Sequence, residues 1–297
     1  MTTSQAAPQA APSAKPKSKR PLVIALAVVL VVALGVGGFF GITELMRSGT
    51  YDDAVRLMSD KDYSSALVKF NELGDYRDAQ QKATTAQNYI DYEAAKARFD
   101  SGDLEGALTE FTRLSSAGFI DSSDWVKQVK YALAEKKLAA GDNFGAYYDF
   151  ASLGSYSDAV ARAEASKIPF PASGIIWQDP AFFSVDCGIK FDYRFSSGGS
   201  FYKIYAGSQL IATVFMNGIS EVMVEVPPGD YIIKEGTGDL WWGPELAFGE
   251  KGYYSTMTFD DYGTDYVNLA YNELVTITIG SAGAGNISER DEDLSSF

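Results

Sequence analysis

Three hydrophobic patterns follow one another along the chain, and each predicts a different kind of element. Residues 22–42 form an uninterrupted apolar run, residues 50–167 carry apolar positions at helical spacing, and residues 170–282 alternate apolar with polar positions. A helix places every third or fourth residue on one face, whereas a strand turns successive side chains to opposite faces. The sequence therefore predicts a multidomain chain with one transmembrane helix, an α-helical repeat region and an all-β antiparallel sandwich.

The apolar run contains no charged residue, and the tail over 1–20 carries four basic residues and no acidic residue. Twenty-one helical residues span about 32 Å, which is enough to cross the hydrocarbon core of a bilayer. Because basic flanks stay in the cytoplasm, we expect a disordered cytoplasmic tail, a transmembrane helix over 21–43 and an extracytoplasmic remainder. The alternative is a cleaved signal peptide, whose apolar core is normally about 7–15 residues. Gly37 and Gly41 have the spacing of a helix-dimerisation motif.

Residues 50–167 contain three copies of one sequence pattern, spaced 41 and 39 residues apart. In each copy a turn ends in Asp. An Ala follows four residues after the Asp, an aromatic residue four after the Ala, and a Leu three after the aromatic residue. We interpret the copies as three helical hairpins, in which the Asp caps the second helix and the small Ala lets the helices approach closely. The packing pairs are Ala66 with Phe70, Ala107 with Phe111, and Ala146 with Phe150.

The middle copy resembles a tetratricopeptide repeat in its turn Gly102-Asp103, in Leu104, in the packing Ala107 and in Phe111. The period is longer than the ~34 residues of that family, and the proline that normally closes a unit is absent. The resemblance implies a concave groove that binds peptides or segments of other proteins. A spacer without a ligand is the alternative.

Short segments with period two begin after residue 170 and are separated by turn residues, which is typical of a sandwich. The segment 226–231, Val-Pro-Pro-Gly-Asp-Tyr, resembles a hairpin of immunoglobulin-like and prealbumin-like modules on bacterial surfaces. The segment 238–254 resembles C-terminal β modules of uncharacterised bacterial membrane proteins. Residues 283–297 are rich in acidic side chains, and we expect a disordered tail there. The expected strands are 189–195, 210–216, 222–226, 231–235, 253–259 and 274–279.

The charge and the rare residues exclude several classes of function. The net charge is −14, and subtracting the +4 of the basic tail leaves −18 for the remainder, which argues against nucleic-acid binding. The absence of histidine excludes Ser-His-Asp and Cys-His catalysis and removes the commonest zinc ligand. Cys187 is the only cysteine, so it cannot form an internal disulfide, and we expect a small buried side chain. No cofactor is expected.

Four aromatic residues are the candidate binding residues: Trp241, Trp242, Tyr253 and Tyr254. Exposed aromatic rings can stack on sugars or anchor a partner protein. The alternative is a loop that covers the core of the sandwich, in which case at least one of the two Trp rings is buried.

Clustered carboxylates at Asp260, Asp261 and Asp265 can in principle hold calcium, but they lack the alternate-residue spacing and the distal Glu of an EF-hand loop. A polar hairpin turn is the favoured interpretation, and no metal site is predicted. Catalysis by a pair of carboxylates needs two acidic residues close together, and the sequence places no such pair.

The sequence therefore favours a non-catalytic bacterial scaffold, anchored by a single pass in the cell membrane. Its extracytoplasmic part is expected to bind another exported or envelope protein through the helical repeats, the β-sandwich or both. A module that binds cell-wall glycan through exposed aromatic residues is the first alternative. A carboxylate-based hydrolase is the second.

Overall fold

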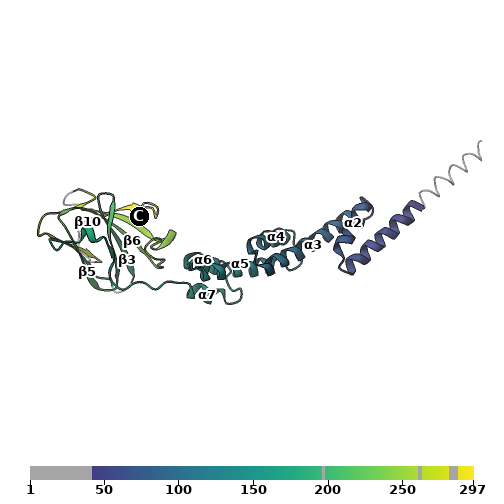
Figure 1. Cartoon of the computed structure of the whole chain (residues 1–297), viewed down its shortest axis with the longest axis horizontal. Helices are drawn as coiled ribbons and strands as arrows, with labels where there is room; N and C mark the ends of the chain where they lie inside the picture. Colours follow the sequence, from purple (N-terminus) through teal and green to yellow (C-terminus); the bar gives the residue numbers. More distant parts are fainter. Residues whose placement is uncertain (1–41, 196–197, 260–262, 281–286) are drawn as a thin grey trace, which may run out of the picture. The chain divides into compact units, whose positions relative to one another are not determined.

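The computed structural model describes residues 42–195, 198–259, 263–280 and 287–297. Helices occupy these residues as far as Ala165, and strands follow from Gly174 onward (Figure 1). The chain divides into two compact units, which we call the first unit (Met1–Ser123) and the second unit (Asp124–Phe297). The predicted order of helical repeats before β-structure is therefore correct.

The structure contradicts the predicted transmembrane helix over 21–43 and the single-pass location in the cell membrane. In the part of the chain that the structure describes, no helix is both long and apolar enough to cross a membrane. The described helix at 42–59 carries five charged residues, and each charge is costly in a hydrocarbon core. The following lie outside the described residues: the basic tail (1–20), the apolar run as far as residue 41, Gly37 and Gly41.

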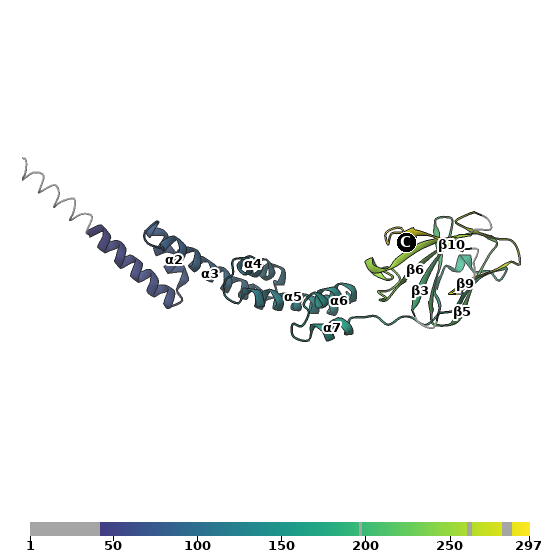
Figure 2. The same ribbon diagram turned by 180° about the vertical axis from the view of Figure 1, so that it is seen from behind.

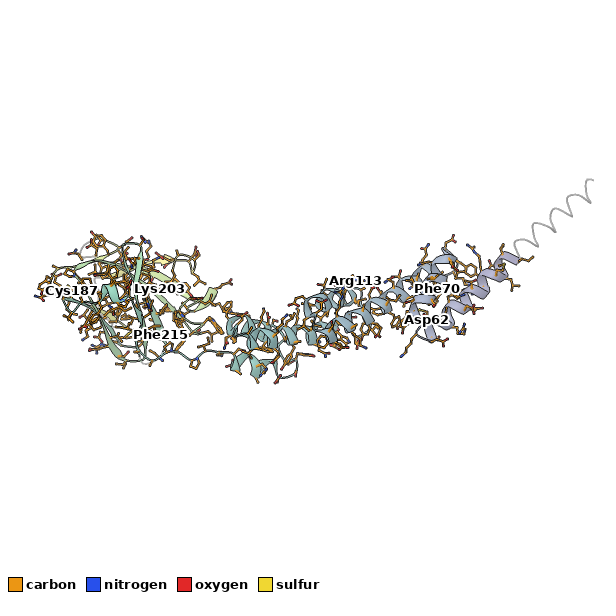
Figure 3. All side chains as sticks on the ribbon, in the orientation of Figure 1. Asp62, Phe70, Arg113, Cys187, Lys203 and Phe215 are labelled. Carbon is orange, nitrogen blue, oxygen red and sulfur yellow. The ribbon has the colours of Figure 1, made fainter. Side chains whose placement is uncertain are left out.

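The helices form hairpins whose turns share one construction. The bounds are 42–59, α2 Tyr63–Leu73, α3 Ala79–Ser101 and α4 Leu104–Ser116, followed by α5 Ser122–Ala139, α6 Asn143–Ser152 and α7 Ala159–Ala165. Each hairpin turn has a residue with positive φ followed by an Asp that accepts a hydrogen bond from the backbone N–H three residues later. The positive φ angles are 62° at Lys61, 86° at Gly102 and 83° at Gly141. The accepting carboxylates are Asp62, Asp103 and Asp142, at 3.1, 3.1 and 2.8 Å. Asp62 is labelled in Figure 3.

These hydrogen bonds confirm the predicted N-terminal caps and allow one to be tested. Replacing Asp142 by Ala is expected to lower the free energy of unfolding by about 1 kcal/mol, because the Gly145 N–H loses its acceptor. Asp142→Asn keeps an oxygen acceptor and is expected to retain nearly all of the stability. Urea unfolding monitored by far-UV circular dichroism measures both variants. Equal losses in the two variants would show that the charge stabilises the turn and the cap does not.

The three Ala–aromatic pairs of the repeats are all fully buried. A tyrosine that the repeat pattern had not included packs its ring edge against the aromatic residue of each pair, with centroids 6.0, 5.7 and 5.3 Å apart. Its hydroxyl donates to the Asp that precedes the following helix, so one side chain ties three segments of each hairpin together. The hydroxyl–carboxylate pairs are Tyr51–Asp78, Tyr92–Asp121 and Tyr131–Asp158, at 2.5, 2.7 and 2.6 Å.

The strands of the second unit form two sheets (Figure 2). The large sheet has the order β1-β4-β3-β6-β7-β10, with β8 beside β6, and the small sheet has the order β5-β2-β9. The strands are β1 Gly174–Gln178, β2 Cys187–Tyr193, β3 Gly199–Ala206, β4 Gln209–Asn217, β5 Ser220–Val226, β6 Gly229–Gly238, β7 Tyr253–Phe259, β8 Val267–Leu269, β9 Leu274–Ile279 and β10 Ile287–Glu292. Two short 3₁₀ helices are η1 Pro180–Phe182 and η2 Gly249–Lys251.

The predicted all-antiparallel sandwich is wrong in one respect, because the small sheet is mixed. β2 pairs with β5 in the antiparallel sense but with β9 in the parallel sense, from Gly188 opposite Leu274 to Tyr193 opposite Ile279. β9 follows β8, which belongs to the large sheet, so the chain crosses between sheets and enters the small sheet in the direction of β2. Alternation along a strand reports which face is buried and carries no information about the direction of its neighbour.

The predicted disordered tail over 283–297 is also wrong for residues 287–297. β10 pairs with β7 over its whole length, and Phe297 is buried. The acidic composition is compatible with a strand because Glu292 forms an ion pair with Lys234 at 2.6 Å and accepts a hydrogen bond from Thr256. Residues 281–286 lie outside the described part of the chain.

The large sheet is apolar on both faces. Its inner face packs against the small sheet, with Tyr202, Ile233 and Phe191 in the shared core. Cys187 belongs to the same core and is buried, as predicted. The outer face of the large sheet carries an aromatic cluster that includes Phe201, Phe215, Trp241, Phe248, Tyr254 and Phe297.

Candidate functional site

Three of the four predicted binding aromatics are buried. Trp241 and Tyr254 are each 3% exposed, Trp242 is 6% exposed, and Tyr253 is 48% exposed. A ring that stacks on a sugar must offer one face to solvent. Of the four residues, only Tyr253 does so, and the glycan hypothesis therefore loses most of the surface on which it was based.

The two tryptophans pack in different places. Trp241 belongs to the aromatic cluster on the outer face of the large sheet, where its ring centroid lies 4.8 Å from Phe215 and 5.0 Å from Phe201. Trp242 packs instead against α6, at 5.4 Å from Phe144 and 5.2 Å from Tyr147. Trp242 thus connects the third hairpin with the β-structure inside the second unit.

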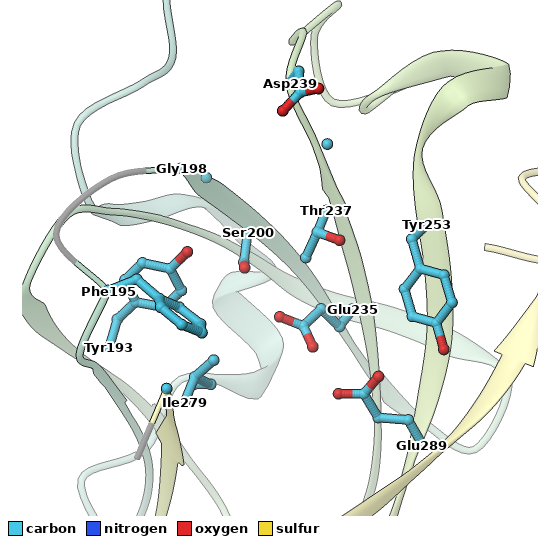
Figure 4. Close-up of a pocket in the computed structure, with 13 residues that line it drawn as sticks. Tyr193, Phe195, Gly198, Ser200, Glu235, Thr237, Asp239, Tyr253, Ile279 and Glu289 are labelled. Carbon is cyan, nitrogen blue, oxygen red and sulfur yellow. The ribbon is translucent and has the colours of Figure 1, made fainter. Parts of the chain in front are cut away.

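The β-structure contains a cleft of about 620 Å³ between its two sheets, which we call the inter-sheet cleft. Figure 4 shows its two walls: polar side chains from the large sheet on one side, and Tyr193, Phe195 and Ile279 on the other. The polar wall consists of Ser200 on β3, Glu235 and Thr237 on β6, Tyr253 on β7 and Glu289 on β10, with Asp239 at the rim.

Glu235 is the unusual group of the inter-sheet cleft, because its side chain is only 5% exposed. Its carboxylate accepts a hydrogen bond from the Tyr202 hydroxyl at 2.5 Å. Burial raises the pKa of Glu235 to about 7, and the nearby charge of Glu289 acts in the same direction, against the lowering effect of hydrogen bonds from Tyr202 and Ser200. The cleft therefore holds a carboxyl group that changes its charge near neutral pH.

Glu289 lines the same cleft as Glu235, and its proximity helps to raise the pKa of Glu235. The structure thus places together two carboxyl groups that the sequence did not connect. Glycoside hydrolysis needs carboxyl groups about 5 Å apart or more, so that a sugar ring or a water fits between them. The shared place of Glu235 and Glu289 in the cleft does not by itself support that reaction, and the hydrolase alternative stays a prediction.

The predicted candidates for calcium are only partly described. Asp260 and Asp261 lie outside the described residues, and Asp265 forms an ion pair with Arg290 at 2.5 Å. Among the residues that the structure describes, no three acidic or cysteine side chains are grouped so as to hold a metal ion.

The first unit contains a groove of about 460 Å³, which we call the hairpin groove. Polar, mostly uncharged side chains from α2, α3 and α4 line it: Asn71, Gln80, Thr84, Gln87, Asn88, Asp91 and Arg113, beside Leu67 and Ala83. Arg113 and Asp91 neutralise each other in an ion pair, and Gln87 donates to Asp91 at 2.8 Å. The side chains of Asn71 and Gln80 are exposed in the groove, and Asn88 is half-buried.

Comparison of the chain with protein-family models, curated proteins and solved structures finds no match. The resemblance to tetratricopeptide repeats and to bacterial β modules is therefore neither supported nor contradicted.

The inter-sheet cleft was missed from sequence, and a groove in the helical repeats was expected without its residues; both left a signal. Glu235 stands two residues after Ile233 and four after Tyr231, so alternation placed its carboxyl group on the buried face. On α3, Gln80, Gln87 and Asp91 follow a helical spacing that forms a polar stripe. Glu289 had no comparable signal, because its strand was expected to be disordered.

Proposed function

We propose that this chain is a non-catalytic scaffold protein whose hairpin groove binds an extended segment of another protein. The observation that supports the proposal most directly is the row of amide side chains that lines the groove, of which Asn71 and Gln80 are exposed to a ligand. An amide side chain donates and accepts at once, and it therefore matches the N–H and C=O groups of an extended backbone. The resemblance to tetratricopeptide repeats favours the same kind of ligand.

The charge balance of the groove favours recognition of a peptide backbone over recognition of a charged motif. The only basic residue in its lining, Arg113, is already engaged with Asp91 and with Glu110, the latter at 3.2 Å. Leu67 and Ala83 supply the apolar surface that a side chain of the bound segment would contact.

Selection of 12-residue peptides from a display library by the full-length chain tests the proposal. Selected peptides are expected to bind about tenfold more weakly to a double variant, Asn71→Ala with Asn88→Ala. Two lost hydrogen bonds correspond to about 1–3 kcal/mol of binding free energy. The matched control is Gln81→Ala. Gln81 lies on α3 with Asn88, and its exposed amide side chain does not line the groove. If peptides are not enriched, or if both variants bind them equally, the proposal fails.

A further inference from the structure

We propose that the inter-sheet cleft binds a primary ammonium group, carried either by a free alkyl diamine or by a lysine side chain. The site lies in the second unit and shares no residue with the hairpin groove, so the inference does not depend on the proposed function.

The charge of the cleft lining is unbalanced. Three carboxyl groups line the cleft, those of Glu235, Glu289 and Asp239, and no lysine or arginine is among the lining residues. The nearest basic residue in the sequence of β6, Lys234, is one position from Glu235, so it points to the opposite face of the sheet and pairs there with Glu292. A cation that enters the cleft therefore meets negative charge without a competing basic side chain.

Two exposed aromatic rings stand on opposite walls of the cleft. Phe195 and Tyr253 line the cleft and are each 48% exposed, so both rings have accessible surface. An ammonium group near the face of an aromatic ring is attracted by the electrons of the ring, and this attraction adds to that of a carboxylate. Carboxylates between aromatic rings are a combination suited to an organic cation.

A buried hydroxyl group without a partner among the described residues lies beside Glu235, although it is not among the residues that line the cleft. Ser255 on β7 lies directly opposite Glu235 in the β6–β7 pairing, so the two side chains share the inner face of the large sheet. Its hydroxyl group is fully buried and has no hydrogen-bond partner among the described residues. Buried polar groups are normally satisfied, and an orphan beside Glu235 is a local feature that packing alone does not explain.

Two other ligand classes fit the cleft less well. A divalent metal ion needs at least three converging ligands, and the described residues contain no such group. A neutral sugar ring gains no attraction from the unbalanced negative charge of the cleft lining. An ammonium group has three donors and can bind both carboxyl groups from the mouth of the cleft.

The proposal implies a dependence on pH with a definite sign. Glu235 faces Tyr202 on β3, Tyr193 on β2, Tyr253 on β7 and Glu289 on β10, and none of these groups is basic. Its pKa of about 7 means that it is mostly protonated at pH 6 and mostly ionised at pH 8. If the ammonium group binds the ionised form, its affinity is expected to be about tenfold higher at pH 8 than at pH 6.

The test is isothermal titration calorimetry of the full-length chain with 1,5-diaminopentane at pH 8 and pH 6. Binding is expected at pH 8, and Glu235→Gln and Glu289→Gln are each expected to weaken it at least tenfold. Because Glu289 is exposed, its variant reports on binding without a risk to the fold. Glu245→Gln is the matched control, since this exposed side chain does not line the cleft. The neutral analogue 1,5-pentanediol is expected not to bind.

A second titration distinguishes the two sources of the ammonium group. It compares a capped five-residue peptide with a central lysine against the same peptide with norleucine. Binding of the diamine alone identifies a small-molecule amine site, and binding of the lysine peptide identifies a protein partner; both results support the proposal. Three results would overturn it: no binding of either amine, binding that Glu289→Gln leaves unchanged, or equal binding of 1,5-pentanediol.

Discussion

Replacing Trp241 by Ala is expected to destabilise the second unit by about 3–5 kcal/mol, the usual cost of removing a large aromatic side chain from a core. The indole ring is almost completely buried in the aromatic cluster on the outer face of the large sheet, and three Phe rings lie within 5.5 Å of it, measured between centroids. The alanine side chain is too small to fill the volume of the indole ring, so the substitution leaves a cavity. Urea unfolding monitored by near-UV circular dichroism measures the loss.

Trp177→Ala is the matched control, because Trp177 lies on the edge strand β1 and is 46% exposed. It is expected to cost less than about 1 kcal/mol, as is usual for surface substitutions that leave no cavity. Retention of the folded chain on insoluble cell-wall glycan is measured in parallel. If Trp241→Ala abolished such retention while leaving the stability unchanged, Trp241 would be a binding residue and its burial would have been misjudged.

The helical repeats were predictable because the spacing of apolar residues in the sequence directly identifies the face of each helix that is buried. Ala66 and Phe70 lie four residues apart, which places both on the buried face of one helix turn whatever the rest of the chain does. The tyrosines that complete each hairpin were not included because they lie in the preceding helix. Tyr51 and Phe70 are 19 positions apart, and only the folded hairpin shows that their rings meet.

The β-structure was predictable strand by strand but not in its pairing. Alternation located β5, which has one face against the core, and also β7, although β7 is buried on both faces. The parallel pairing of β2 with β9 depends on where the chain crosses between sheets, which local alternation does not encode. The C-terminal segment was wrongly predicted to be disordered because its acidic residues find their partners far away in the sequence. Glu292 pairs with Lys234, which lies 58 positions earlier.

The inter-sheet cleft shows why the site was harder to predict than the fold. Glu235 departs from the alternation of apolar residues that otherwise defines β6, and such departures are expected where function and stability compete. Its partner Glu289 comes from a strand added at the edge of the sheet, far later in the sequence. Glu235 and Glu289 line one cleft because β6 and β10 lie on either side of β7 in the large sheet.

Replacing Glu235 by Gln is expected to stabilise the protein at pH 8 and to have little effect at pH 5. An acid whose pKa is raised on folding binds more protons in the folded chain than in the unfolded chain between the two pKa values. The pKa of Glu235 rises from 4.5 to about 7, so its contribution to stability is present at low pH and is lost as the pH rises through this interval. The loss is on the order of 3 kcal/mol.

Gln is neutral at both pH values, and its side-chain oxygen can still accept the hydrogen bond from Tyr202. The measurement is the free energy of urea unfolding of the wild type, Glu235→Gln and the exposed control Glu245→Gln at pH 5 and pH 8. Comparing the variants at each pH separates Glu235 from other titrating groups. If the Glu235→Gln variant exceeded the wild type in stability by the same amount at both pH values, Glu235 would not titrate in this interval.

The same measurement connects the stability of the cleft with its proposed ligand. A cation that binds ionised Glu235 stabilises the folded chain in proportion to the logarithm of its free concentration over its dissociation constant. Adding 1,5-diaminopentane at pH 8 is therefore expected to recover part of the stability that the wild type loses there, and to leave Glu235→Gln unchanged. Equal stabilisation of both proteins would mean that the amine acts elsewhere on this acidic chain, since the net charge of −14 attracts cations generally.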